Sequence, residues 1–160
     1  MDKDHVLRQQ LAKFLDWHEG HADFHAAVDD FPVELRGLTP EGMPYSAWQL
    51  LEHIGIALWD IVEFSRGGKH KSPPWPEGYW PKTAAPPREE DWDASVHAVL
   101  KHLEAMRKLV SDPARDLFAP IPNGTGQTLL REVLLVADHN AYHIGQLVLV
   151  RKALGAWESK

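Results

Sequence analysis

The sequence contains no cysteine, and this absence removes several classes of site at once. A chain without cysteine has no disulfide, no thiolate-ligated metal and no cysteine nucleophile. Any transition metal must therefore be held by histidine and carboxylate side chains, which are the remaining strong ligands.

Long apolar runs and basic clusters are also missing from the 160 residues. No apolar stretch approaches the roughly 20 residues that a membrane span needs, and the start, "MDKDHVLRQQ", lacks the apolar core of a signal peptide. The net charge is −6, and the densest basic stretch is only "RGGKHK" at 66–71, whereas nucleic-acid binders usually present a basic face. We therefore expect a cytoplasmic protein, with neither nucleic acid nor membrane as a partner.

Apolar periodicity predicts an all-α fold with four long helices and no strand. Ser46 is a good N-cap for the second helix and Gly155 a good C-cap for the fourth. The connection 67–88 is rich in proline and glycine and long enough to run the length of a helix, so the second and third helices can lie parallel in a four-helix bundle. The expected helices cover about residues 3–29, 47–66, 88–111 and 128–154.

The stretch "DHNAYHIGQL" places His139 and His143 four residues apart within the fourth expected helix. Four residues make just over one helical turn, so both imidazoles emerge on one face, where they can share a transition metal. Two histidines can also acquire this spacing by chance. The interpretation depends on a third ligand from elsewhere in the chain.

His53 is the candidate for that third ligand, because it lies in the apolar stretch "WQLLEHIGIALW" and is expected to point inward. A single inward histidine is more often a hydrogen-bonded core residue than a ligand. Together with His139 and His143, however, it would complete a set of three neutral imidazoles that suits zinc, nickel or a similar ion such as copper or iron, of which zinc and nickel are our first choices. Three protein ligands leave coordination positions open, as catalytic metal sites do.

These motifs resemble those of the DinB/YfiT-like metalloenzyme superfamily: "WQLLEHIG", then "DHNAYHIGQL" followed by "LVLVRKALG". The resemblance runs from Ser46 to the end of the chain. It implies a single DinB-like domain over 1–160, a four-helix bundle of up-down-down-up topology, and one divalent metal per chain on His53, His139 and His143. Family members with assigned activities include thiol-dependent transferases and isomerases, so a low-molecular-weight thiol cosubstrate is implied. A homodimer agrees with the resemblance and with the general frequency of twofold oligomers.

No residue near the paired histidines is an obvious general base. Asn140 follows His139 where the metalloprotease motif has glutamate. Glu132, two turns before His139, would serve only if the pocket extends that far, and a salt-bridged glutamate is the alternative. Water or a thiol held by the metal would then react with a small-molecule substrate, in thiol transfer or metal-assisted hydrolysis. Two other functions stay open: a non-catalytic metal- or ligand-binding bundle, and an interaction protein without metal.

Further histidines and tryptophans are candidates for lining a pocket. His18, His21 and His25 continue the apolar stripe of the first expected helix; they would be partly exposed, line the pocket that faces the metal, or form a separate metal site. Trp75 and Trp80 lie in the proline-rich stretch "SPPWPEGYWPK". That segment would form a lid or pocket wall, cap the core, or make an oligomer contact.

Overall fold

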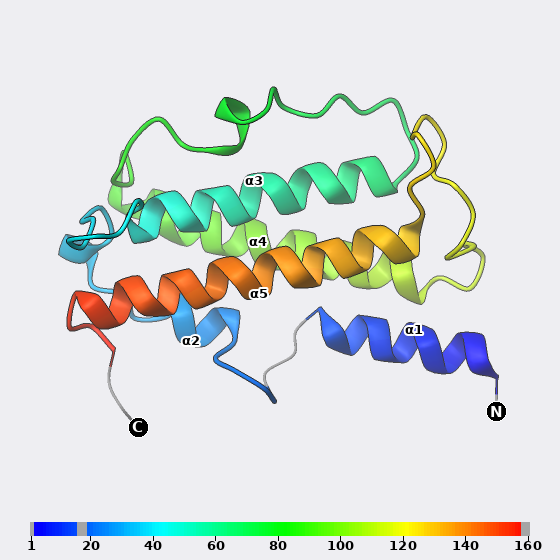
Figure 1. Ribbon diagram of the computed structural model, residues 1–160, viewed down its shortest axis with the longest axis horizontal. Coiled ribbons are helices and arrows are strands. Elements are labelled where there is room, and N and C mark those ends of the chain that lie inside the picture. The colour runs from blue at the N-terminus through cyan, green and yellow to red at the C-terminus, as the bar shows by residue number, and fades with distance from the viewer. Residues whose placement is uncertain (1, 16–18, 158–160) are drawn as a thin grey trace.

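The computed structural model describes residues 2–15 and 19–157, and this part of the chain is all-helical with no strand (Figure 1). The all-α class predicted from periodicity is therefore confirmed. The elements are α1 Lys3–Phe14, α2 Phe24–Val28, the 3₁₀ helix η1 Val33–Leu35, α3 Ala47–Ser65, the 3₁₀ helix η2 Glu77–Tyr79, α4 Glu89–Ser111 and α5 Leu129–Ala153.

The three long helices begin and end close to the expected residues, because their caps are encoded locally. The Ser46 side chain accepts a hydrogen bond from the Gln49 backbone, and Gln49 reciprocates in a capping box that starts α3. The Thr128 side chain accepts from the Arg131 backbone and starts α5. Beyond α5, Gly155 adopts a φ of 72°, a left-handed conformation in which glycine carries little steric penalty.

The prediction of one continuous helix over residues 3–29 is wrong. The structure ends α1 at Phe14 and starts a separate, short α2 at Phe24. Asp23 provides the physical reason for the restart, since its side chain accepts a 2.8 Å hydrogen bond from the Ala26 backbone as an N-cap. Gly20 lies between the two helices and costs about 1 kcal/mol in a helix interior.

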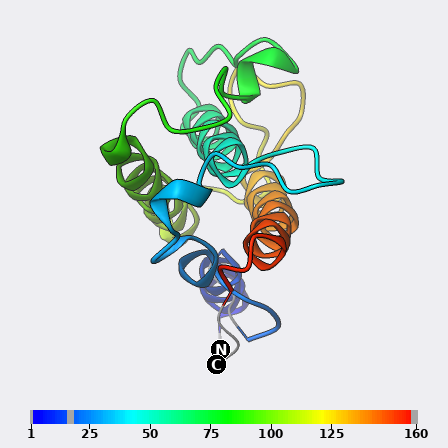
Figure 2. The same ribbon diagram turned by 90° about the vertical axis from the view of Figure 1, so that its left-hand side faces the viewer.

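The long helices surround a common apolar core. Viewed end-on, α3, α4, α5 and the α1–α2 pair occupy four positions around the centre (Figure 2). Fully buried side chains from several helices meet there, including Ile54 and Leu58 of α3, Met106 of α4 and Leu147 of α5. The connection 66–88 leaves the end of α3 and returns along that helix to the start of α4, so α3 and α4 run in the same direction (Figure 1).

Among the described helices, none has both the length and the apolar character that crossing a bilayer requires.

Candidate metal centre

Three imidazoles from two helices converge beneath the connection 66–88. His53 comes from α3, and His139 and His143 come from successive turns of α5. Their ligand nitrogens all lie within 4.8 Å of one another, and His53 Nε2 is 3.1 Å from both His143 Nε2 and His139 Nε2. His53 and His143 are buried, with exposed fractions of 4% and 8%, and His139 is half-buried. The spacing of four residues in α5 thus presents both histidines to α3.

Hydrogen bonds on the opposite ring nitrogens fix two of these imidazoles. His53 Nδ1 lies 2.8 Å from the backbone carbonyl of Tyr79, which can only accept, so Nδ1 carries the proton. His143 Nδ1 lies 2.7 Å from Gln146 Oε1 and donates to it in the same way. A neutral imidazole with a proton on Nδ1 presents a lone pair at Nε2. Two lone pairs therefore face each other across 3.1 Å.

This arrangement fits a shared cation. Two lone pairs in contact repel each other when buried, and a cation between them removes the repulsion. Two nitrogens each about 2.0–2.1 Å from one zinc ion lie roughly 3 Å apart at tetrahedral or octahedral angles, close to the contacts of His53. In a metal-bound histidine, the ring nitrogen that does not bind the metal usually donates a hydrogen bond to an oxygen of the protein. Nδ1 of His53 and Nδ1 of His143 both do so here.

The surroundings keep the three imidazoles neutral. Burial, followed by the neighbouring His143 and His53, lowers the pKa of His139 to about 4. Burial is also the main reason that the pKa values of His53 and His143 lie below the ordinary value of this side chain. Neutral imidazoles are the form that binds a metal, so the ligand set is ready near neutral pH.

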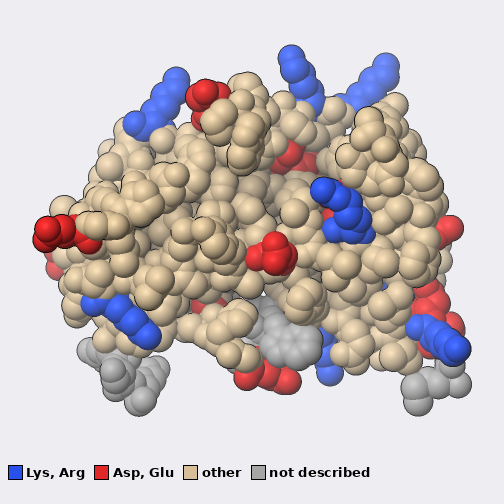
Figure 3. All heavy atoms as spheres, viewed as in Figure 1, with Lys and Arg blue, Asp and Glu red and all other residues tan. Residues whose placement is uncertain are grey.

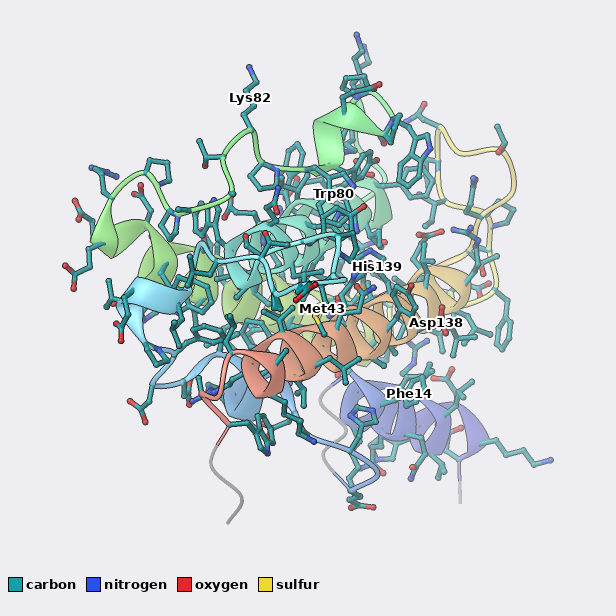
Figure 4. All side chains as sticks on the ribbon, turned by 60° about the vertical axis from the view of Figure 1, so that its left-hand side comes forward. Phe14, Met43, Trp80, Lys82, Asp138 and His139 are labelled. Atoms are coloured by element: carbon teal, nitrogen blue, oxygen red, sulfur yellow. The ribbon has the colours of Figure 1, made fainter. Side chains whose placement is uncertain are left out.

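Aromatic rings cover one side of the centre. Trp80, from the connection 66–88, stacks on His53 with ring centroids 4.0 Å apart and an interplanar angle of 3°. Tyr45 stacks in turn on Trp80 at 4.0 Å, and Figure 4 shows Trp80 and His139 on the same side of the molecule. Trp80 therefore forms a wall of the centre, whereas Trp75 is 74% exposed and contacts Tyr79 by its ring edge.

A buried carboxylate fastens the connection to α3. Asp60 Oδ1 lies 2.6 Å from His70 Nε2, and Asp60 Oδ2 accepts a 2.6 Å hydrogen bond from the Tyr79 hydroxyl. Burial and then Asp60 raise the pKa of Tyr79 to about 12, so its hydroxyl stays a donor. Sequence reasoning missed this set, because His70 and Tyr79 lie in an irregular segment whose spacing predicts no contact with a helix.

The remaining predicted residues lie elsewhere. Glu132 is buried at the start of α5, and its Oε1 accepts a 2.6 Å bond from exposed Arg131. His25 is exposed and faces Asp29 at 3.2 Å. His21 is exposed and borders a cavity of about 450 Å³ that lies between α1, α2 and a different face of α5. Neither joins the three-histidine cluster, and His18 lies outside the described residues.

A small apolar groove adjoins the centre. It has a volume of about 160 Å³ and includes Met43, Tyr45, Leu50, Gln146 and Leu149 in its walls. Gln146 is the residue that accepts the His143 Nδ1 proton, and Tyr45 belongs to the aromatic stack. The groove is therefore one side chain, Gln146, away from His143, and two side chains, Tyr45 and Trp80, away from His53.

Comparison with known proteins identifies a family. A sequence model of the DinB superfamily matches residues 16–147, a span that includes all three clustered histidines, the connection 66–88 and most of α5. No curated protein and no solved structure matches the chain.

Proposed function

The chain belongs to the DinB superfamily, and from this membership and its three converging imidazoles we propose a metal-dependent enzyme that acts on a small molecule. The reaction we propose is thiol-dependent transfer or metal-assisted hydrolysis. The proposal includes the up-down-down-up arrangement of a DinB bundle, which the parallel course of α3 and α4 supports.

The observation that carries the proposal is the meeting of Nε2 atoms from His53, His139 and His143. Three neutral imidazoles would hold one divalent ion, with zinc or nickel the best matches to an all-nitrogen set. Such a set leaves further coordination positions for water or substrate. When bound, the ion would act as a Lewis acid that lowers the pKa of water or a thiol.

The chain's own residues prepare this chemistry in two ways. Tyr79 and Gln146 accept the Nδ1 protons and so hold the imidazoles of His53 and His143 in the orientation that exposes Nε2. Trp80 covers the ring face of His53 and excludes water from it. The small molecule would approach from the side that this stack leaves free.

The surface around α3 and α5 favours a substrate with little charge. Figure 3 shows that this face carries only scattered acidic and basic side chains. The adjoining apolar groove would take an apolar part of the substrate. A thiol would have to be a cosubstrate, because the chain has no cysteine; its sulfur would bond to an electrophilic carbon of the substrate, while the displaced group leaves with a proton. In hydrolysis, the oxygen of water would take the place of sulfur.

Metal content tests the proposal directly. Purified untagged protein, reconstituted with zinc or nickel and passed through a desalting column, is expected to retain about one ion per chain by mass spectrometry. His143→Ala is expected to lose it, and His97→Ala is the matched control, because His97 is an exposed histidine of α4 outside the cluster. A wild-type protein that retains no stoichiometric metal would contradict the proposal. Retention by both variants would place the metal elsewhere.

A further inference from the structure

The Asp60 carboxylate is buried on the same face of α3 as His53. The two residues are seven positions apart, which is two helical turns. Asp60 is 9% exposed, and each of its carboxylate oxygens has a partner from the connection: Oδ1 faces His70 Nε2 and Oδ2 accepts from the Tyr79 hydroxyl, both at 2.6 Å. Both oxygens of the carboxylate therefore contact residues of the connection.

Tyr79 joins Asp60 to the imidazole of His53. Its side chain is held by Asp60, while its backbone carbonyl accepts the His53 Nδ1 proton at 2.8 Å. The next residue, Trp80, stacks on the His53 ring. The dipeptide Tyr79-Trp80 therefore contacts both Nδ1 and the ring face of His53, and the Tyr79 hydroxyl binds the dipeptide to Asp60.

We propose that Asp60 is a positioning residue for His53: by holding the Tyr79 hydroxyl, it keeps the Tyr79 carbonyl where it selects the Nδ1-protonated tautomer and aims Nε2 at His139 and His143. That this orientation of His53 Nε2 favours metal binding rests on the proposed function. The positioning itself can be measured in protein from which metal has been removed.

Placement of the carboxylate argues for this role. A carboxylate on a helix is costly to bury without partners, and α3 does not need one to complete its own backbone hydrogen bonds. The segment that Asp60 holds is largely exposed and irregular, apart from the short helix η2 Glu77–Tyr79. Within this segment Asp60 binds Tyr79, and the backbone carbonyl of Tyr79 accepts the hydrogen bond from His53.

The test uses Tyr79→Phe, which removes the hydroxyl and keeps the backbone carbonyl, beside Asp60→Ala and Asp60→Asn. Asparagine keeps an oxygen that can accept the Tyr79 hydroxyl and serves as the rescue. The matched control is Ser95→Ala, which removes the hydrogen bond from Ser95 Oγ to Glu52 Oε1, one residue from His53 but outside the connection. Circular dichroism verifies folding, and Tyr79→Phe provides the test if Asp60→Ala does not fold.

The first measurement is the tautomer of His53 in metal-free protein, from long-range ¹H–¹⁵N correlation spectra. We expect the Nδ1-protonated form in the wild type, in Asp60→Asn and in Ser95→Ala, and a mixture of tautomers in Tyr79→Phe and Asp60→Ala. The second measurement is zinc affinity by competition with a chelator, with the visible spectrum of bound cobalt as a report of geometry. We expect Tyr79→Phe to bind zinc about 10–100-fold more weakly and to shift the cobalt bands.

A wild-type tautomer in both Tyr79→Phe and Asp60→Ala would overturn the inference. So would loss of the tautomer in Ser95→Ala to the same extent, since the effect would then be one of general packing. If the wild-type protein binds no stoichiometric metal, the proposed function fails, and the tautomer comparison in metal-free protein still decides the role of Asp60.

Discussion

His139 has a low pKa because protonation would place a charge in a half-buried site beside two other imidazoles. The same surroundings lower the pKa values of His53 and His143. In the unfolded chain, each of these side chains returns to its ordinary pKa of about 6.5. Folding therefore releases protons from these groups when the pH lies between the folded and the unfolded values.

The metal-free protein is accordingly expected to lose stability as the pH falls from about 6.5 towards 4, because the unfolded state binds more protons over this range. The contribution of His139 is on the order of 2–3 kcal/mol, and those of His53 and His143 have the same sign. Urea unfolding at pH 7.5, 6 and 5 measures it. His139→Gln should flatten the profile and His97→Ala should not; equal slopes in His139→Gln and wild type would show that the His139 imidazole does not cause the loss.

At the level of single residues, the sequence predicted some contacts of the candidate site and not others. The pairing of His139 with His143 follows from helical spacing, because both residues lie on one element. The meeting of His53 with them depends on how α3 and α5 pack, which spacing does not encode; the apolar surroundings of His53 predicted only that it points inward, and the family resemblance then implied the complete set. The contact of Asp60 with Tyr79 could be found only from the structure, since Tyr79 ends a short 3₁₀ helix within the proline-rich connection, whose sequence pattern predicts no contact with α3.

Helix boundaries that depend on neighbouring residues were predicted better than features that depend on distant contacts. Periodicity and caps predicted α3, α4 and α5 closely, because Ser46 and Thr128 act on backbone groups within three residues. The break between α1 and α2 was missed, although Asp23 is a local N-cap, because the apolar stripe of the first helix was extended through the polar residues that follow it. The role of Trp80 stayed open among three alternatives, since a proline-rich connection has no period.

Arg8 joins α1 to the end of α4. Its side chain is buried and donates to the carbonyls of Val110 at 2.9 Å, Asp112 at 3.0 Å and Arg115 at 2.7 Å, while Asp4 pairs with its Nε. The last carbonyls of a helix have no partners within the helix, and a cation there also interacts favourably with the helix dipole. Arg8 thus completes the C-terminus of α4.

Arg8→Ala is expected to lower the free energy of unfolding by about 2–3 kcal/mol, because buried carbonyls lose charged donors. Chemical denaturation measures the loss, and Arg88→Ala, an exposed arginine at the other end of α4, should have a much smaller effect. Metal stoichiometry should be unchanged in Arg8→Ala, since Arg8 contacts none of the clustered histidines. A destabilisation no larger than that of Arg88→Ala would show that the buried contacts of Arg8 contribute little.

At the scale of the whole molecule, the three-histidine cluster and the apolar core are separate groups of side chains. The histidines come from α3 and α5 and lie beneath the connection 66–88, whereas the buried apolar side chains of α3, α4 and α5 pack together in one cluster. Ile54, Leu58, Met106 and Leu147 are almost completely buried, and burial of apolar side chains is the main favourable contribution to folding. The fold therefore has its own source of stability.

Metal removal is expected to leave this fold intact. Protein treated with a chelator should keep its helical circular dichroism and a cooperative thermal transition, because the core does not depend on the histidines. Zinc at roughly 100 times its dissociation constant should then add about 2.7 kcal/mol and raise the midpoint by about 5–10 °C, and His143→Ala should show no such rise. Loss of helical structure on chelation would instead indicate a structural metal, and it would favour a non-catalytic metal-binding bundle over an enzyme whose ion exchanges from an open site.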